Sequence, residues 1–313
     1  MPKNNFRKIP ALGTVLAVLS TLGCASAEGP LEIRRTQTFE KALARQRALH
    51  APEPASDDAP ARLLQTGDAH RASGRNGEAH LAYVRAHFAN RQDLAPLERI
   101  AYLALREDPE RARILFDELA VDAPSSVSVR VGLGYALAAA GELEAAQAEL
   151  ERAVELDPNS QAALVTLGIV SDRLGDVESA TAAYQQALET GGETAQVLNN
   201  LGVSHLLADE PEAAVRYFKR ARALQPRDPA VSNNLGLALG LLGRDTEAMT
   251  AFQRNGTKGD ALNNLGLAHY LRGDLAGARI LFERALLADD TDEIRVLRNL
   301  ERLERTSHQQ DGA

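Results

Sequence analysis

The sequence predicts an all-α protein built from repeated helical hairpins, and three observations support this fold class. Alanine, leucine, glutamate and arginine, which favour helices, dominate the chain, whereas tryptophan is absent and aromatic residues make up only 4%. Leu-Gly pairs return along the chain at a nearly constant period. Each pair is followed at constant distances by an alanine and by a larger apolar residue. An array of this kind grows in one dimension, so chain length alone does not set its number of domains.

The period is set by five leucines, each followed by glycine, which are spaced by 34, 34, 34 and 30 residues: Leu133, Leu167, Leu201, Leu235 and Leu265. An alanine stands thirteen residues after each leucine, at Ala146, Ala180, Ala214, Ala248 and Ala278. Four residues further on comes a larger side chain, at Leu150, Tyr184, Phe218, Phe252 and Phe282. Small residues let the two helices of a hairpin approach closely, and we expect the larger residue to fill the space toward the next hairpin. Glycines predict the turn within four of the hairpins and Asp209 replaces them in a fifth, the glycines being Gly141, Gly175, Gly243 and Gly273.

This pattern resembles the tetratricopeptide repeat, a helix-turn-helix unit of 34 residues with Leu-Gly, alanine and an aromatic residue in this order. The resemblance implies a right-handed solenoid whose first helices line a concave surface that binds peptides. In this register we expect five units over residues 127–292, of which the unit 229–258 is shortened. Two degenerate units precede them over residues 60–126, and in the second of these Arg99-Ile100 replaces Leu-Gly.

Residues 293–306 predict a helix that caps the array after the last unit. Ile294, Leu297, Leu300 and Leu303 recur at every third residue, which places them along one stripe of a helix. Such a stripe can cover the apolar face that the last hairpin leaves open. We expect residues 307–313 to form a disordered tail.

Residues 1–27 have the organisation of an export signal, in which basic residues precede an uncharged stretch from Ala11 to Gly23. That stretch is shorter than the roughly 20 residues needed to span a bilayer. Two processing sites compete. The sequence before Cys24 resembles a bacterial lipobox, which would make Cys24 a lipidated N-terminus, whereas the three residues ending at Ala27 fit ordinary signal cleavage. The protein is thus expected to be an outer-membrane lipoprotein facing the periplasm or, after cleavage at Ala27, a soluble periplasmic protein.

Residues 28–59 predict a linker. Leu31 to His50 can form one short basic helix with a ragged apolar face, and we expect this helix to dock on the first repeat rather than to contact lipid. Three prolines between residues 51 and 60 prevent the helix from continuing.

Composition and motifs argue against several classes of function. The chain has 35 lysines and arginines against 43 aspartates and glutamates, a formal net charge of -8, which is the wrong sign for a nucleic-acid binder. One cysteine excludes an intramolecular disulfide framework and a cysteine-based zinc site. Catalytic, phosphate-binding and calcium-binding motifs are absent from the sequence. His70, His205 and His269 occupy equivalent places in three units and are predicted to be packing residues. We therefore expect no enzyme activity, no cofactor and no metal.

Paired asparagines before three of the Leu-Gly pairs predict a peptide-binding groove. A primary amide offers two donors and an acceptor, so it can bond a peptide backbone without reading its side chains. In proteins of the resembled family, asparagines at this place form a ladder of amides that bonds the backbone of an unstructured segment. The alternative is that they bond the neighbouring unit or suit the first turn of a helix. The predicted groove comprises Asn199, Asn200, Asn233, Asn234, Asn263 and Asn264 and, one and two turns further along, Val203, Leu207, Leu237, Leu241, Leu267, Tyr270 and Leu271.

The export signal, the repeats and a shortened unit followed by Ala-Leu-Asn-Asn-Leu-Gly at residues 261–266 together resemble the TadD family, lipoproteins of the tight-adherence pilus. The resemblance implies a non-enzymatic scaffold of the bacterial cell envelope. Its concave groove would hold a protein or peptide partner, such as a secretin or another pilus component, and help it to assemble. Two alternatives stay open: an adaptor or regulator of peptidoglycan enzymes, and the pilotin of another secretion system.

Overall fold

The computed structural model describes residues 59–288, 290 and 292–311, and this part of the chain contains fifteen helices, α3 to α17, and no strand. It falls into two compact units, residues 59–157 and 158–311, and each is described by itself. The predicted export signal, Cys24 and the linker up to residue 58 lie outside the described residues.

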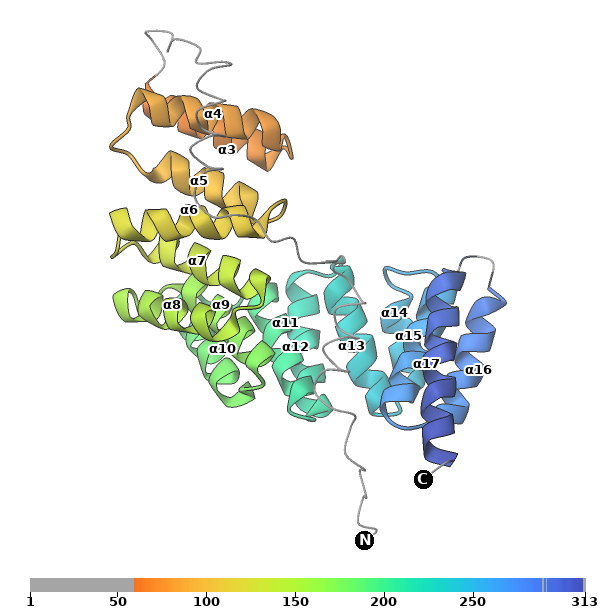
Figure 1. Ribbon diagram of the computed structural model, residues 1–313. Helices are drawn as coiled ribbons and strands as arrows, with labels where there is room; N and C mark the ends of the chain where they lie inside the picture. Colours follow the sequence, from red (N-terminus) through yellow and green to blue (C-terminus); the bar gives the residue numbers. More distant parts are fainter. Residues whose placement is uncertain (1–58, 289, 291, 312–313) are drawn as a thin grey trace. The chain divides into compact units, whose positions relative to one another are not determined.

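Residues 59–157 form three helical hairpins that follow one another in chain order (Figure 1). The first pairs α3 (Pro60–Ala72) with α4 (Asn76–Ala89), and the second pairs α5 (Ala95–Ala104) with α6 (Pro109–Asp122). The third pairs α7 (Val127–Ala140) with α8 (Leu143–Leu156). The first two hairpins are the degenerate units expected over residues 60–126.

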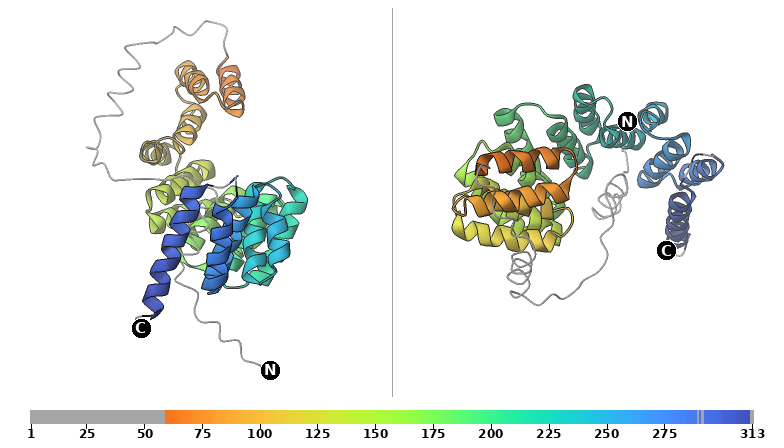
Figure 2. Two further views of the ribbon diagram at one scale, coloured as in Figure 1. Left: turned by 90° about the vertical axis from the view of Figure 1, so that its right-hand side faces the viewer. Right: turned by 90° about the horizontal axis from the view of Figure 1, so that it is seen from above.

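Residues 158–311 form four hairpins and a last single helix. The hairpins are α9 (Gln161–Leu174) with α10 (Val177–Gly191), α11 (Ala195–Leu207) with α12 (Pro211–Leu224), α13 (Pro229–Leu241) with α14 (Asp245–Phe252), and α15 (Lys258–Leu271) with α16 (Leu275–Leu286). The helix α17 (Glu293–Asp311) packs against α16 and α15 at the end of the row (Figure 2, left).

The repeated alanines and glycines bring the helices of each hairpin together. The alanines of all seven hairpins have no exposed surface: Ala79, Ala112, Ala146, Ala180, Ala214, Ala248 and Ala278. At Gly236 an added Cβ would lie 2.6 Å from the ring of Phe252, well inside contact distance. Six hairpins share this arrangement, in which the large side chain of the second helix lies on the glycine of the first. The large residue therefore closes its own hairpin, a role that the sequence analysis placed at the following unit.

The turns within the hairpins use the residues that the sequence predicted. Gly141 has φ of 87°, and the two amides at this turn donate to carbonyls in the last turn of α7. Such a left-handed residue costs little energy only when it lacks a Cβ. Asp209 takes this conformation without being glycine, with φ of 60°, at the turn before α12.

A side-chain cap begins each first helix from α7 onward. The capping oxygens belong to Ser126, Ser160, Thr194, Asp228 and Thr257, and each accepts a hydrogen bond from an amide in the first turn. A cap of this kind contributes about 1 kcal/mol because it satisfies an amide that has no partner within the helix. The repeat is therefore encoded at its start as well as in its core.

The hairpin of α5 and α6 departs from this packing because Ile100 occupies the place of the glycine. With a branched side chain there, the ring of Phe116 lies instead on Gly132 of α7, in the next hairpin. Tyr102 packs edge-on against Phe116, with ring centroids 5.0 Å apart, and donates a hydrogen bond of 2.7 Å to the Ser128 carbonyl. The missing glycine thus shifts the large side chain to a new partner.

The shortened unit ends its second helix early, at Phe252. The helix α14 has 8 residues, whereas α12 has 14. Asn255 Nδ2 then donates to Ser232 Oγ at 2.9 Å and to the Asp228 carbonyl at 3.3 Å. These bonds tie the loop that replaces the missing turn to the start of α13.

The capping helix is longer than predicted. We expected it over residues 293–306 with a disordered tail from 307, but α17 continues to Asp311. No glycine or proline stands between residues 293 and 311, so nothing in the sequence stops the helix there. The Ser307 hydroxyl donates to the Leu303 carbonyl at 3.1 Å within this extension.

We predict that Gly67→Ala destabilises the first hairpin by about 1–3 kcal/mol, because the added methyl group would overlap the ring of Tyr83. Gly77→Ala in the same hairpin is the matched control, since nothing lies within 4 Å of its Cβ, and it should stabilise α4 by roughly 0.5–1 kcal/mol. Amide hydrogen exchange over residues 60–89 measures both effects. Equal exchange in the two variants would contradict the packing described above.

Candidate functional site

The first helices of residues 158–311 form one layer and carry the predicted groove residues. The helices α9, α11, α13 and α15 pack against one another in that order, and α17 continues the row after α15. Each second helix packs against its own first helix and the first helix of the next hairpin. The candidate site is therefore the face that consecutive first helices present together.

Asparagines of consecutive first helices bond one another, so these amides are not free to form the expected ladder. Asn234 Nδ2 on α13 donates to Asn199 Oδ1 on α11 at 2.9 Å. Asn263 is fully buried and accepts a bond of 2.8 Å from Asn299 on α17. Asn264 is also buried, and its Oδ1 lies 3.4 Å from Asn263 Nδ2. Asn234 and Asn263 thus join consecutive first helices, as in the alternative that the asparagines bond the neighbouring unit, whereas Asn264 contacts the adjacent Asn263.

Three of the predicted groove leucines belong to the core. Leu237, Leu267 and Leu271 are buried in the cluster of side chains around Phe252 and Phe282. A first helix inside the array is covered on two sides by neighbouring helices, so its apolar residues do not all face the same surface. These three leucines are therefore removed from the candidate site.

The last position of the predicted groove is covered by α17. Tyr270 Oη and Thr306 Oγ1 are 2.9 Å apart, and Arg295 forms an ion pair with Asp260 at the start of α15. Tyr270 and Asn263 of α15 therefore contact the cap of the same chain. The sequence analysis assigned them to a partner because it did not place the cap over this helix.

A smaller set of predicted residues stays half-buried on α11 and α13 and forms the candidate site. The side-chain nitrogen of one of them, Asn200 Nδ2, has no hydrogen-bond partner among the described residues although it is shielded from solvent. An amide donor without a partner costs about 1–3 kcal/mol, so it is an unusual feature of a native fold. The set comprises Asn199, Asn200, Asn233, Val203, Leu207 and Leu241.

Family models of the tetratricopeptide repeat match residues 127–170, 165–229, 201–255 and 259–292. The chain belongs to the tetratricopeptide repeat proteins. Five of its hairpins, α7 to α16, lie within these matches. The two degenerate hairpins before residue 127 lie outside them and are identified from the buried alanines and from the packing of their helices.

Solved structures share the fold. A thermophilic tetratricopeptide repeat protein of Thermus thermophilus is 24% identical with a TM-score of 0.53, over 58% of this chain and 99% of its own. A repeat protein of Parabacteroides merdae is 16% identical with a TM-score of 0.55, over 78% of this chain and 98% of its own. A chain of the Cut9–Hcn1 hetero-tetramer of the APC/C is 16% identical with a TM-score of 0.54, over 91% of this chain and 55% of its own. No curated protein matches the chain.

The repeat histidines pack as predicted in part, and one of them also joins two repeats through polar contacts. His269 on α15 lies 2.8 Å from Asp274 and 2.9 Å from Asp245 on α14. Arg272 donates to the Gly240 carbonyl at 2.8 Å and to Asp245 at 3.1 Å. His205 stacks on Tyr217 with ring centroids 5.1 Å apart. Among the described residues no group of histidines, cysteines and acids has the arrangement of a metal site.

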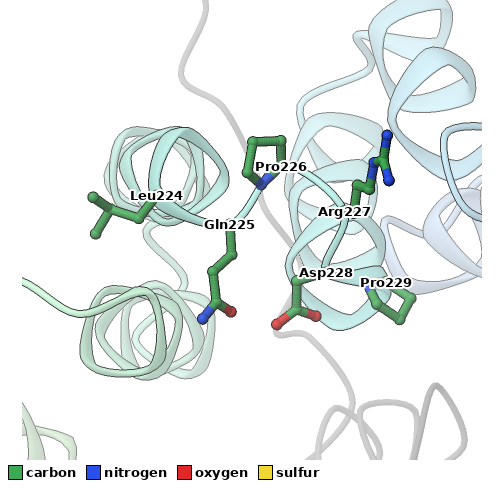
Figure 3. A pocket seen from close by; sticks show the side chains of 6 residues that line it. All are labelled: Leu224, Gln225, Pro226, Arg227, Asp228 and Pro229. Atoms are coloured by element: carbon green, nitrogen blue, oxygen red, sulfur yellow. The ribbon is translucent and has the colours of Figure 1, made fainter.

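Two hollows of the surface were not predicted. The loop from Leu224 to Pro229 lines an open depression between α12 and α13 (Figure 3). The Asp228 carboxylate in this depression already accepts hydrogen bonds from two backbone amides of α13. A smaller, apolar cavity of about 160 Å³ lies among α4, α5 and α6, where Ile100 and Leu97 face Leu115 and Leu119. Its position coincides with the hairpin that lacks the glycine. None of the helices in the described ranges is long and apolar enough to cross a bilayer.

A buried carboxylate on α9 was also missed by the sequence analysis. Asp172 accepts a hydrogen bond of 2.5 Å from Ser204 on α11 and one of 3.1 Å from Tyr184 on α10. Burial raises the pKa of this carboxyl to about 6, although the two hydroxyl groups act in the opposite direction. The group joins two consecutive repeats and titrates close to neutral pH. Its one sequence signal is an aspartate at a helix position where the next three repeats have Leu206, Gly240 and Tyr270.

We predict that Asp172→Asn makes the protein more stable than the wild type near pH 7 and that this advantage disappears near pH 4. In the unfolded chain the carboxyl ionises near pH 3.9, whereas in the folded chain it stays protonated to about pH 6. Raising the pH through this window therefore weakens the wild type, by roughly 3 kcal/mol in all, and leaves the variant unaffected.

Thermal unfolding measured from pH 4 to pH 7.5 tests this difference. Asp176→Asn is the control, because Asp176 is an exposed cap of α10 whose pKa is lowered by hydrogen bonds from Ser179, so this variant should change the pH profile in the opposite direction. A wild type and an Asp172→Asn variant with parallel pH profiles would show that the buried carboxyl does not shift its pKa.

Proposed function

We propose that this protein is a non-enzymatic scaffold that holds a segment of a partner polypeptide against the first helices α11 and α13. The observation that carries this proposal is Asn200 Nδ2 in the half-buried set on these helices, which has no hydrogen-bond partner in the described ranges. A carbonyl group of a bound chain would satisfy this donor.

The surroundings of Asn200 suit a polypeptide better than a small metabolite. Val203 and Leu207 follow on the same face of α11, one and two turns along, and Leu241 lies toward the end of α13. A row of half-buried apolar side chains beside an amide donor offers contacts along a chain rather than an enclosed pocket. Recognition of this kind binds the peptide backbone through hydrogen bonds and its side chains through apolar burial.

We further propose that the scaffold works in the bacterial cell envelope and serves the assembly of a tight-adherence type pilus or a secretin. The support is the export signal of residues 1–27, the lipobox-like sequence at Cys24 and the resemblance of the shortened unit to the TadD family. A lipid on Cys24 would hold the repeats at a membrane surface, since each buried methylene contributes about 0.8 kcal/mol. An adaptor of peptidoglycan enzymes or a pilotin of another system remains the second candidate, because these share the export signal and the repeats.

Asn200→Ala is expected to weaken partner binding and to leave the free protein as stable as the wild type or slightly more stable, because Nδ2 has no hydrogen-bond partner among the described residues and the variant removes this unsatisfied donor. Asn263→Ala is the matched control. It removes the buried bond to Asn299 and should lower stability by about 1 kcal/mol without acting on the proposed surface.

A photo-crosslinking side chain at Leu207 measures partner binding in intact cells, and mass spectrometry identifies the crosslinked protein. The same probe at exposed Val121 on α6 reports background. The scaffold proposal fails if Asn200→Ala leaves the yield at Leu207 unchanged. Secretin or pilus peptides in the crosslinked product support the first candidate, and peptidoglycan hydrolases support the second.

Cys24→Ser is expected to abolish incorporation of labelled palmitate and to move the protein from the membrane to the soluble fraction. The hydroxyl of serine cannot replace the thiol that carries the lipid. Fractionation of cells followed by immunoblotting measures the distribution. Ser26→Thr, which keeps the lipobox intact, is the control. An unchanged membrane fraction for Cys24→Ser would remove the anchor.

A further inference from the structure

The helix α17 has the register of a first helix. In the five units from α7 to α16, the residue four places before the repeat leucine and the residue three places after it are at most 1% exposed. If Leu300 takes the place of the repeat leucine, Val296 and Leu303 take these two places, and both have no exposed surface. The helix therefore packs on α15 and α16 as the first helix of a further repeat would.

The asparagine bonds support the same register. Asn234 stands directly before a repeat leucine and donates to Asn199 on the preceding first helix. Asn299 stands directly before Leu300 and donates to Asn263 on the preceding first helix. The two bonds measure 2.9 and 2.8 Å and join equivalent positions. The row of first helices thus continues through α17 without a change of spacing.

Among the described residues no second helix covers one face of α17. Three places before the repeat leucine stand Leu164, Leu198 and Leu262, which are 1%, 0% and 4% exposed. Leu198 packs in one cluster with Ala221 of its own second helix, α12. The equivalent residue of α17, Leu297, is 48% exposed, and Ile294, one turn earlier, is 70% exposed. This face is apolar because it corresponds to the inside of a hairpin.

A helix that packs on this face of α17 would meet a different residue at the position where other second helices meet a glycine. In six of the seven hairpins the large side chain of the second helix lies on a glycine, one place after the repeat leucine. In α17 that place is taken by Glu301, whose exposed carboxylate lies 3.6 Å from Arg305 on the same helix, whereas Glu304 pairs with Arg279 of α16 at 3.7 Å. A carboxylate excludes the close approach of an aromatic ring and favours a cation opposite to it.

We propose that α17 is the first helix of an eighth, incomplete repeat, which a partner protein completes with one amphipathic helix. The incoming helix runs antiparallel to α17. It places two apolar residues on Ile294 and Leu297, and a lysine or arginine opposite Glu301 in place of the repeat aromatic. This surface is separate from the one proposed on α11 and α13, so either can fail without the other.

A designed peptide tests the proposal with the full chain carrying Cys24→Ser, which excludes association through a lipid. The probe is a fluorescein-labelled peptide of residues 273–290 with Phe282→Lys, which reproduces α16 with a lysine in place of its aromatic residue. We expect fluorescence anisotropy to show saturable binding. The peptide with Phe282 retained should bind more weakly, because its ring meets Glu301.

Variants of α17 define which residues the peptide contacts. Leu297→Ala should weaken binding tenfold or more, since burial of a leucine is worth roughly 1.5–3 kcal/mol. Glu301→Lys should weaken binding about fivefold to tenfold, and more at low salt than at high salt. Leu81→Ala on α4, which removes an equally exposed leucine far along the chain, is the control and should have no effect.

Two results would overturn the proposal. The first is the absence of saturable binding, or binding that Leu297→Ala and Glu301→Lys leave unchanged, which would show that this face does not accept such a helix. The second is a dimer of the chain alone, measured by sedimentation velocity, that Leu297→Ala dissociates, which would show that a second copy covers the face. Far-UV circular dichroism confirms that each variant is folded.

Discussion

The contact between a glycine on one helix and a large side chain on the next sets how closely the two helices of a hairpin pack, and the other features of the array depend on it. Each glycine leaves room for one ring or leucine, which is then fully buried. The same hairpin repeats, so its first helices form a row and the asparagines at equivalent places come within bonding distance. A polar contact such as that between Asn234 and Asn199 exists because the apolar contact beneath it fixes the spacing.

Departures from this contact mark the parts of the protein that differ from a regular array. Ile100 replaces the glycine in α5. Phe116 then packs on Gly132 of the next repeat, and an apolar cavity lies beside α4. Glu301 replaces the glycine in α17, and in the part of the chain that the structure describes no second helix packs on the adjoining face. In both cases the substitution adds a side chain where two helices would otherwise meet. An array can thus keep its length and period and still acquire a local surface of its own.

The sequence predicted the hairpins, their turns and the shortened unit, because these depend on residues that act locally or at a constant spacing. It did not predict which side chains are buried between helices and which face solvent. Periodicity places Leu237 and Leu267 on a helix face, but whether that face meets solvent or a neighbour depends on how the next repeat sits, which no spacing reports. The amides of Asn234 and Asn263 could bond a peptide or a neighbour equally well. Asn299, the partner of Asn263, stands directly before Leu300 as Asn234 stands before Leu235, but the sequence analysis did not extend the repeat into the capping helix.

The division among the asparagines follows from position in the row. An asparagine on an inner first helix has another first helix on each side. Its amide is hydrogen-bonded when an amide of the neighbouring helix lies close enough. At α15 Asn263 accepts a bond from Asn299 on α17, and Asn264 is buried beside it. At α11 Asn199 accepts a bond from Asn234 on α13, whereas Asn200 Nδ2 has no partner among the described residues. A buried donor without a partner lowers the stability of the free protein, and in the proposed complex a carbonyl group of the bound chain would satisfy it.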